Sequence, residues 1–272
     1  MLKSSFAPRS HFDDQPEDEC ILKDKSPFVE LTSDSLDEYM FTKVMMVNDE
    51  CGHFLFSPGD GPLKIGSISS MIRPALEKKV EAFGLYLYAD DKKNDCKLLL
   101  SSTGEHNTRV DDSWLMAFQD LFALLRVDLG QLEVFIVDGL NYIHVMNAKE
   151  GDQIGYFKYL KTSGTSQSTK VGIILDSLIS DTNRFREIPS GVLLSGATAT
   201  LVTYCESRQL PCVAVLAIRE VRRSAALYKS VEVLMSPCSD FVGCHQDNPS
   251  TEAYLDRCAK DAFQSDTENL YT

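Results

Sequence analysis

Residues 191–218 read GVLLSGATATLVTYCESRQLPCVAVLAI, and the fold class can be inferred from this segment. Residues 191–209 have the length of a helix, and residues 211–218 form an almost wholly apolar run. A strand without polar alternation is typical of a sheet that is covered on both faces. The stretch therefore predicts a helix that leads into a central strand.

The same combination of helix and apolar strand occurs upstream. A helix is predicted after Ser113, where Asp111, Asp112 and Ser113 can cap it and large apolar side chains recur at helical spacing. Residues 132–137 then predict a buried strand, and shorter strand-like runs lie at 53–56, 84–88 and 97–100. Helices that alternate with apolar strands predict the α/β class, with a mixed, largely parallel sheet and helices on both faces.

The chain of 272 residues predicts one domain between two less regular ends. Residues 1–25 are acidic, contain prolines and show no apolar period, so we expect a disordered arm. Residues 26–263 form the predicted single α/β domain, with a mobile Ser/Thr-rich loop at 161–170 and a last helix at 251–263. A domain boundary at that loop is the less favoured alternative. Residues 264–272 are polar before the last three positions and predict a flexible tail.

The net charge of −13 is concentrated near the two ends, and the middle of the chain is close to neutral. Without a clustered basic face, nucleic acid and anionic membranes are not expected as partners. No apolar run reaches the roughly 20 residues of a membrane span. A protein or a small molecule remains as the expected partner.

The eight cysteines are scattered and form no CxxC pair. We expect reduced, buried thiols and a cytosolic or nuclear protein, because a small secreted scaffold would be shorter and denser in cysteine. The first residues lack the apolar segment of a signal peptide.

No motif in the sequence predicts catalysis. The two glycines and the lysine of residues 57–64 are accompanied by two prolines, so a turn is favoured over a phosphate loop. Gly191 and Gly196 lack dinucleotide-binding spacing, the histidines are isolated, and no serine lies in a Gly-x-Ser-x-Gly elbow. Cys244 and His245 are adjacent, which does not build a metal site. We therefore expect no catalytic residue, no metal and no cofactor, although a site assembled in space stays open.

The sequence ends in Leu270, Tyr271 and Thr272, a hydrophobic residue followed by tyrosine and any residue. A polar stretch before them would hold the apolar pair away from the domain. Leu270 and Tyr271, with a free carboxylate on Thr272, would fit a pocket that offers apolar walls and a lysine. These three residues are the candidate binding site.

Three segments and this ending together resemble a known family. The segments GYFKYLKT (155–162), IPSGVLL (188–194) and YCESRQLPCVAVL (204–216), with the C-terminal hydrophobic-Tyr-x motif, resemble the proteasome assembly chaperone 1 family. The resemblance covers residues 153–220 and the last few residues best, and the acidic N-terminal arm is similar.

The resemblance implies a nucleoside-phosphorylase-like architecture that is used without catalysis. It also implies a heterodimer with proteasome assembly chaperone 2, which scaffolds the α ring of the proteasome core particle. Leu270, Tyr271 and Thr272 would then dock between α subunits. Two other interpretations stay open, namely an enzyme of the nucleoside phosphorylase or hydrolase type, and an α/β interaction module of another complex.

Overall fold

The computed structural model describes residues 27–32, 36–48, 63–73, 78–89, 95–102, 113–141, 157–181, 185–188, 194, 196–219, 234, 237–238 and 240–242. Its elements, in chain order, are β1 (Phe28–Leu31), the 3-10 turn η1 (Leu36–Glu38), β2 (Phe41–Val47), β3 (Leu63–Arg73), β4 (Lys78–Tyr88), β5 (Cys96–Ser102), α3 (Ser113–Leu124), β6 (Glu133–Asn141), β7 (Phe157–Lys161), α4 (Lys170–Asp181), β8 (Phe185–Glu187), α5 (Gly196–Ser207) and β9 (Cys212–Arg219).

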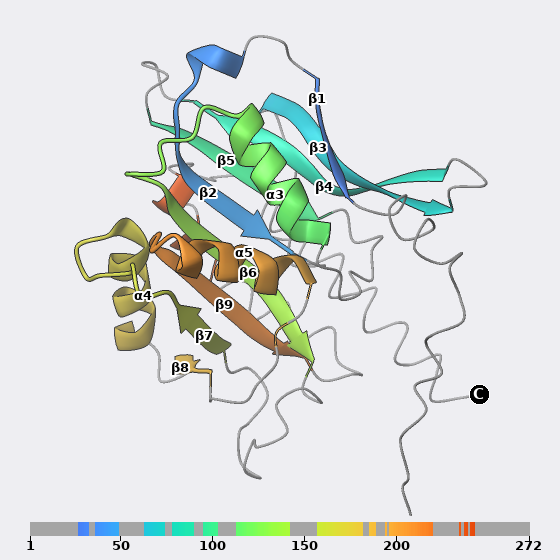
Figure 1. Cartoon of the computed structure of the whole chain (residues 1–272). Helices are drawn as coiled ribbons and strands as arrows, with labels where there is room; N and C mark the ends of the chain where they lie inside the picture. The colour runs from blue at the N-terminus through green and yellow to red at the C-terminus, as the bar shows by residue number, and fades with distance from the viewer. Residues whose placement is uncertain are drawn as a thin grey trace, which may run out of the picture.

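All the labelled strands belong to one nine-stranded sheet with the order β1-β3-β4-β5-β2-β6-β9-β7-β8 (Figure 1). Its centre, β5-β2-β6-β9, is parallel throughout. β1, β3 and β4 extend one side as an antiparallel wing, while β7 returns antiparallel to β9 on the other side and pairs in parallel with β8. The carboxyl ends of the central strands therefore meet at one edge of the sheet.

Apolar residues alternate between two cores along the central strands. In β2, Val44 and Met46 belong to one core, whereas Met45 and Val47 belong to the other. Because both faces of each strand are buried, the strands read as continuous apolar runs rather than as alternating ones.

The helices cover both faces of this sheet. α3 and α5 pack on the first core, through Trp114 and Phe118 of α3 and Leu201 and Tyr204 of α5. In Figure 1 these two helices lie side by side on the face turned to the viewer. α4 packs on the second core through Val171, Ile174, Leu175 and Leu178. The mixed α/β sheet with helices on both faces is thus confirmed, and the parallel pairing is concentrated at its centre.

Most of the predicted elements are found where the sequence placed them. The helix after Ser113 is α3, the strand at 132–137 is the first part of β6, and the strand at 211–218 is β9. The helix expected at 191–209 occupies Gly196–Ser207 as α5. Gly196 has a φ of 69°, a left-handed conformation that glycine adopts at little cost. The run at 53–56 and the helix at 251–263 lie outside the described residues, as do the acidic arm and the C-terminal tail.

Backbone and side-chain hydrogen bonds hold the Ser/Thr-rich loop at 161–170. Thr162 Oγ1 donates to the carbonyl of Leu210 at 2.7 Å and accepts from the amide of Cys212 at 3.0 Å. Thr165 Oγ1 also bonds to the amide and to the carbonyl of Cys212. These contacts favour an anchored loop, whereas composition alone predicts a mobile one, and its mobility stays a prediction.

α3, α4 and α5 each have 12 residues. Across the described part of the chain, no helix combines the length and the apolar character that crossing a membrane requires.

Candidate functional site

A cluster of polar side chains, in which Asn48 and Thr198 are buried and Asp138 is half-buried, lies near the carboxyl ends of β2 and β6. Asp138, near the end of β6, accepts hydrogen bonds from Thr198 Oγ1 of α5 at 2.5 Å and from Asn48 Nδ2, just after β2, at 3.1 Å. The amide of Gly139 donates to its other carboxylate oxygen at 2.6 Å. One carboxylate therefore joins two neighbouring strands to the first turn of α5. We call Asn48, Asp138 and Thr198 the Asp138 junction.

The register of the sheet explains why these residues meet. Val47 lies opposite Val137, so the next residues of the two parallel strands, Asn48 and Asp138, are neighbours. Asn48 and Asp138 lie two residues after Met46 and Ile136, so each is on the same face of its strand as that residue. Met46 and Ile136 belong to the core under α5. The amide of Asn48 also donates to the carbonyl of Val137 at 2.8 Å. β2 ends at this level while β6 continues to Asn141, and the register of the two strands brings the two polar side chains together.

The same face carries two more buried polar residues in line with the Asp138 junction. Ser102 lies two residues after Leu100 in β5, on the same face of the strand, and is next to the end of β2. On the other side, Leu216 of β9 lies opposite both Asp138 and Lys158 of β7. Ser102 and Lys158 are buried. At this level of the sheet, one face therefore bears Ser102, Asn48, Asp138 and, beyond Leu216, Lys158.

Burial controls the electrostatics of the Asp138 junction. Removal from water raises the pKa of the Asp138 carboxyl above the ordinary value of an aspartic acid, against the opposing effect of the hydrogen bonds from Thr198, Asn48 and Gly139. The three donors are all neutral groups. Asp138 can therefore hold a proton at a higher pH than an exposed carboxyl, which is the property of a general acid or of a proton-dependent structural contact.

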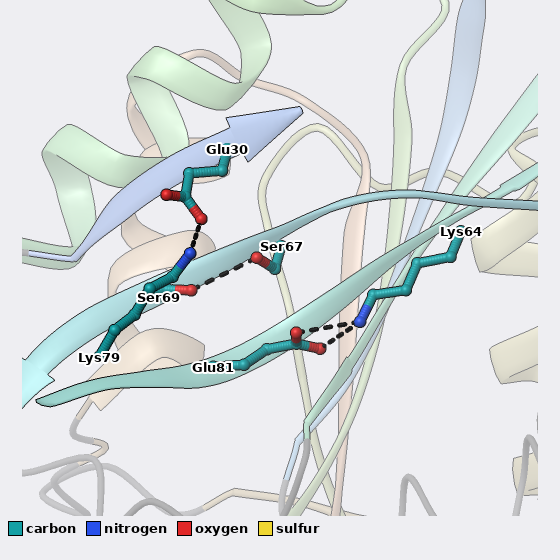
Figure 2. Close-up of polar contacts among 6 residues, drawn as sticks. All are labelled: Glu30, Lys64, Ser67, Ser69, Lys79 and Glu81. Atoms are coloured by element: carbon teal, nitrogen blue, oxygen red, sulfur yellow. Dashed lines mark hydrogen bonds and ion pairs between the residues drawn. The ribbon is translucent and has the colours of Figure 1, made fainter. Parts of the chain in front are cut away.

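A second polar group lies on the antiparallel wing, on strands β1, β3 and β4 (Figure 2). Figure 2 shows Lys79 reaching across β3 toward Glu30, while Lys64 Nζ donates to both carboxylate oxygens of Glu81 at 2.8 and 2.9 Å. Between these pairs, Ser67 Oγ and Ser69 Oγ are 3.3 Å apart and buried. Exposed ion pairs of this kind contribute less than about 1 kcal/mol each, so they help to fix the strand register rather than build a reactive site.

Cysteines and possible metal ligands give no further site in the described residues. Cys96, Cys205, Cys212 and Cys238 are buried thiols outside any disulfide, as expected. A hydrogen bond with Cys205, together with burial, raises the pKa of the Cys212 thiol well above its usual range, which keeps it unreactive. No group of three or more His, Cys, Asp or Glu side chains that could hold a metal is found in this part of the chain.

The candidate residues from the sequence and the cluster found in the structure are different. Leu270, Tyr271 and Thr272 lie outside the described residues, as do Cys244 and His245. Lys64, from the rejected phosphate loop, lies in β3 and pairs with Glu81. Sequence reasoning missed Asp138, although a polar residue directly after each of two apolar runs, at positions 48 and 138, was an available signal.

No protein-family model matches the chain, and no curated protein matches it. Solved structures do. PbaB of Pyrococcus furiosus, an archaeal proteasome activator, is 12% identical, with a TM-score of 0.54 over 91% of this chain and 100% of that one. PbaA of the same organism, an archaeal homolog of proteasome-assembly chaperone, is 11% identical in its monoclinic crystal form, with a TM-score of 0.50 over 91% of this chain and 95% of that one.

An enzyme is also among the matches. A mutant of futalosine hydrolase from Helicobacter pylori is 11% identical, with a TM-score of 0.43 over 74% of this chain and 99% of that one. At such identities a match speaks for the fold and not for the chemistry. The chain shares its α/β fold with the archaeal proteins PbaB and PbaA.

Proposed function

We propose that this chain is a non-catalytic chaperone subunit in the assembly of the proteasome core particle. The observation that carries the proposal is the match in fold to PbaB, which extends over 91% of this chain and the whole of PbaB. The match to PbaA, a homolog of proteasome-assembly chaperone, supports the same role. The sequence segments at 155–162, 188–194 and 204–216 point independently to assembly chaperones.

A more specific part of the proposal names the partners of this subunit. The chain would form a heterodimer with proteasome assembly chaperone 2, and the pair would scaffold the α ring. Leu270 and Tyr271 would enter a pocket between α subunits, and a free carboxylate on Thr272 would pair with a lysine of that pocket. We expect the chain in the cytosol or the nucleus, where thiols stay reduced. Proteasomes would have to be assembled in the same compartment.

Energetics limit what such a tail can do alone. Burying Leu270 and the ring of Tyr271 contributes about 1.5 to 3 kcal/mol each, and pairing the carboxylate with a lysine adds about 1 to 3 kcal/mol. Ordering a flexible end and associating two proteins oppose much of this, so the isolated tail should bind with a Kd on the order of 0.1 to 1 mM. Once the folded domain is docked, the tethered tail adds about 10- to 100-fold in affinity.

The test compares α-ring binding by the heterodimer with intact and altered tails. Tyr271→Ala and deletion of residues 270–272 should each weaken binding by about 10- to 100-fold. Thr272→Ala is the matched control, because it keeps the carboxylate and changes a position where any residue is accepted. Unchanged affinity in both altered proteins would refute the tail site, while the domain's role would then rest on whether the heterodimer still binds the ring.

An enzyme acting on nucleosides is the second candidate, and Asp138 is the observation that favours it. A carboxyl with a raised pKa at the carboxyl edge of a parallel sheet occupies the place where α/β enzymes bind substrates. Both carboxylate oxygens of Asp138, however, already accept hydrogen bonds from Asn48, Gly139 and Thr198. We expect no release of base from a panel of nucleosides, with or without phosphate. Turnover that Asp138→Asn abolishes would establish the enzyme instead.

A further inference from the structure

Asp138 and Gly139 form an Asp-Gly pair in which the backbone amide of the glycine contacts the carboxyl group of the aspartate. The amide nitrogen of Gly139 lies 2.6 Å from Oδ1 of Asp138. The other oxygen of the same carboxyl accepts from Asn48 and from Thr198, so the group is held in this orientation. The nitrogen therefore lies directly beside the carboxyl carbon of the residue that precedes it.

The end of β2 explains why this amide meets the side chain of Asp138. The amide of Asn48 donates to the carbonyl of Val137, so the backbone groups of Val137 and, two residues later, of Gly139 point toward β2. The pairing of β2 with β6 ends at Val47 and Val137. The amide of Gly139 thus comes after the paired part of β2, where it donates to Asp138.

Three conditions for a reaction between the amide and the carboxyl are met at this pair. The nitrogen is held against the carboxyl group, which makes the reaction intramolecular between positioned groups. Glycine has no Cβ that would hinder the approach of its nitrogen. Asp138 and Gly139 are both half-buried rather than buried, so water can reach them.

We propose that Asp138 is a site of spontaneous conversion to isoaspartate in the folded protein. The amide nitrogen of Gly139 attacks the carboxyl carbon of Asp138 and forms a new C–N bond. The hydroxyl of the neutral carboxyl leaves as water together with the amide proton. Water then adds to the cyclic imide, and cleavage of its bond to the main-chain carbonyl leaves isoaspartate, with the mass unchanged. The proposal is independent of the chaperone role.

The product would change the Asp138 junction. In isoaspartate the main chain runs through the side-chain carbon, so β6 gains a methylene group between the aspartate and Gly139, and the free carboxyl stands on a different carbon. The register of Gly139 opposite Ala217 of β9 would be disturbed. Asn48 and Thr198 would lose the acceptor that links them, and with it α5 would lose its polar contact to β6.

Peptide mapping of the incubated full chain, with fragmentation that distinguishes isoaspartate from aspartate, tests the proposal. The reference is the same chain unfolded in urea. Conversion of Asp138 in the folded protein should proceed within about tenfold of its rate in the unfolded chain, because the fold keeps the two groups together. Conversion that is slower than this in the folded protein would overturn the proposal.

Asp176 and Ser177 provide the matched control within the same digest. Both are exposed, but they lie inside α4, where the backbone amides are engaged in the helix. Folding should therefore slow conversion at Asp176 by far more than at Asp138. Equal slowing at the two sites would show that the contact with Gly139 has no effect, and would also overturn the proposal.

Two variants examine the reaction at the same pair. Asp138→Asn forms the same imide with loss of ammonia, so its conversion appears as a mass increase when the amide becomes an acid. Gly139→Ala should slow conversion of Asp138 by about tenfold or more, because a methyl group then hinders the nitrogen. An Asp138→Asn protein that keeps its amide while folded would contradict the proposal, as would unchanged conversion in Gly139→Ala.

Discussion

Gly172 lies inside α4, where alanine would ordinarily stabilise a helix by about 1 kcal/mol. Here the effect should be reversed. A Cβ at this position would lie 2.0 Å from the carbonyl oxygen of Ser166 and 2.9 Å from Thr169 Oγ1. Gly172→Ala should therefore destabilise the protein by about 1 to 3 kcal/mol. Urea denaturation checks this, with Ser177→Ala on the exposed side of the same helix as control. Stabilisation by Gly172→Ala would contradict the packing described.

Asp95 is the electrostatic opposite of Asp138. Partial burial would raise its pKa, but hydrogen bonds from Thr42 and Lys43 and the charges of Lys43 and Lys97 lower it overall. Lys43 Nζ lies 3.0 and 3.1 Å from its two oxygens. Asp95 therefore stabilises the fold above the ordinary aspartic acid pKa, and this contribution is lost as the pH falls through the lowered value.

Because Asp95 is half exposed, its contribution is small. Asp95→Asn should cost less than about 1 kcal/mol at neutral pH, and the difference from the unaltered protein should vanish in acid. Thermal unfolding at a series of pH values measures it. A stability difference between the two proteins that grows toward acid would mean that the pKa of Asp95 is raised rather than lowered.

At the scale of the elements, the loop at 161–170 connects β7 to α4 and is held to the start of β9. The hydroxyl of Thr162 makes two of these contacts, because it donates to the carbonyl of Leu210 and accepts from the amide of Cys212. Thr162→Val keeps the shape and removes the hydroxyl, which should cost about 1 to 3 kcal/mol. Ser168→Ala, at an exposed position of the loop, should change little. Equal melting temperatures for both variants would favour the mobile loop that composition predicts.

The elements that the sequence revealed are those with one clear period. α3 shows a helical stripe and β9 an unbroken apolar run, so both were predictable. α4 has the spacing of Val171, Ile174, Leu175 and Leu178, but it follows a long Ser/Thr run and contains Gly172, which obscure its start. β7, with two lysines in FKYLK, carries no strand period. Strand order and the antiparallel wing depend on pairing between distant segments, which no local pattern encodes.

The contacts within the Asp138 junction could not be predicted for the same reason, although the polar positions 48 and 138 could be picked out. Its partners Asn48 and Thr198 are 90 and 60 residues away in sequence. Asp138 precedes Gly139, and the pair Asp-Gly ordinarily indicates a turn. Only the parallel register of β2 and β6 turns two isolated polar residues into neighbours.

For the whole molecule, a subunit that functions as a heterodimer should expose apolar surface when it is alone. α3 does expose Leu115, Met116 and Leu124 on the side away from the sheet. We therefore expect the isolated chain to self-associate or to be poorly soluble, and co-expression with proteasome assembly chaperone 2 to correct this. Analytical ultracentrifugation of the two preparations is the measurement. A monomer whose thermal transition does not change when the partner is added would contradict the heterodimer.

Co-purification with the chaperone pair is the decisive experiment for a role in proteasome assembly. The chain, tagged at its N-terminus so that Thr272 stays free, is co-expressed with proteasome assembly chaperone 2, and the proteins that co-purify are identified by mass spectrometry. We expect core-particle α subunits in stoichiometric amounts, in complexes that lack mature core particle. A purified pair, or a single chain, that carries no α subunits while the same cells assemble proteasomes would contradict it.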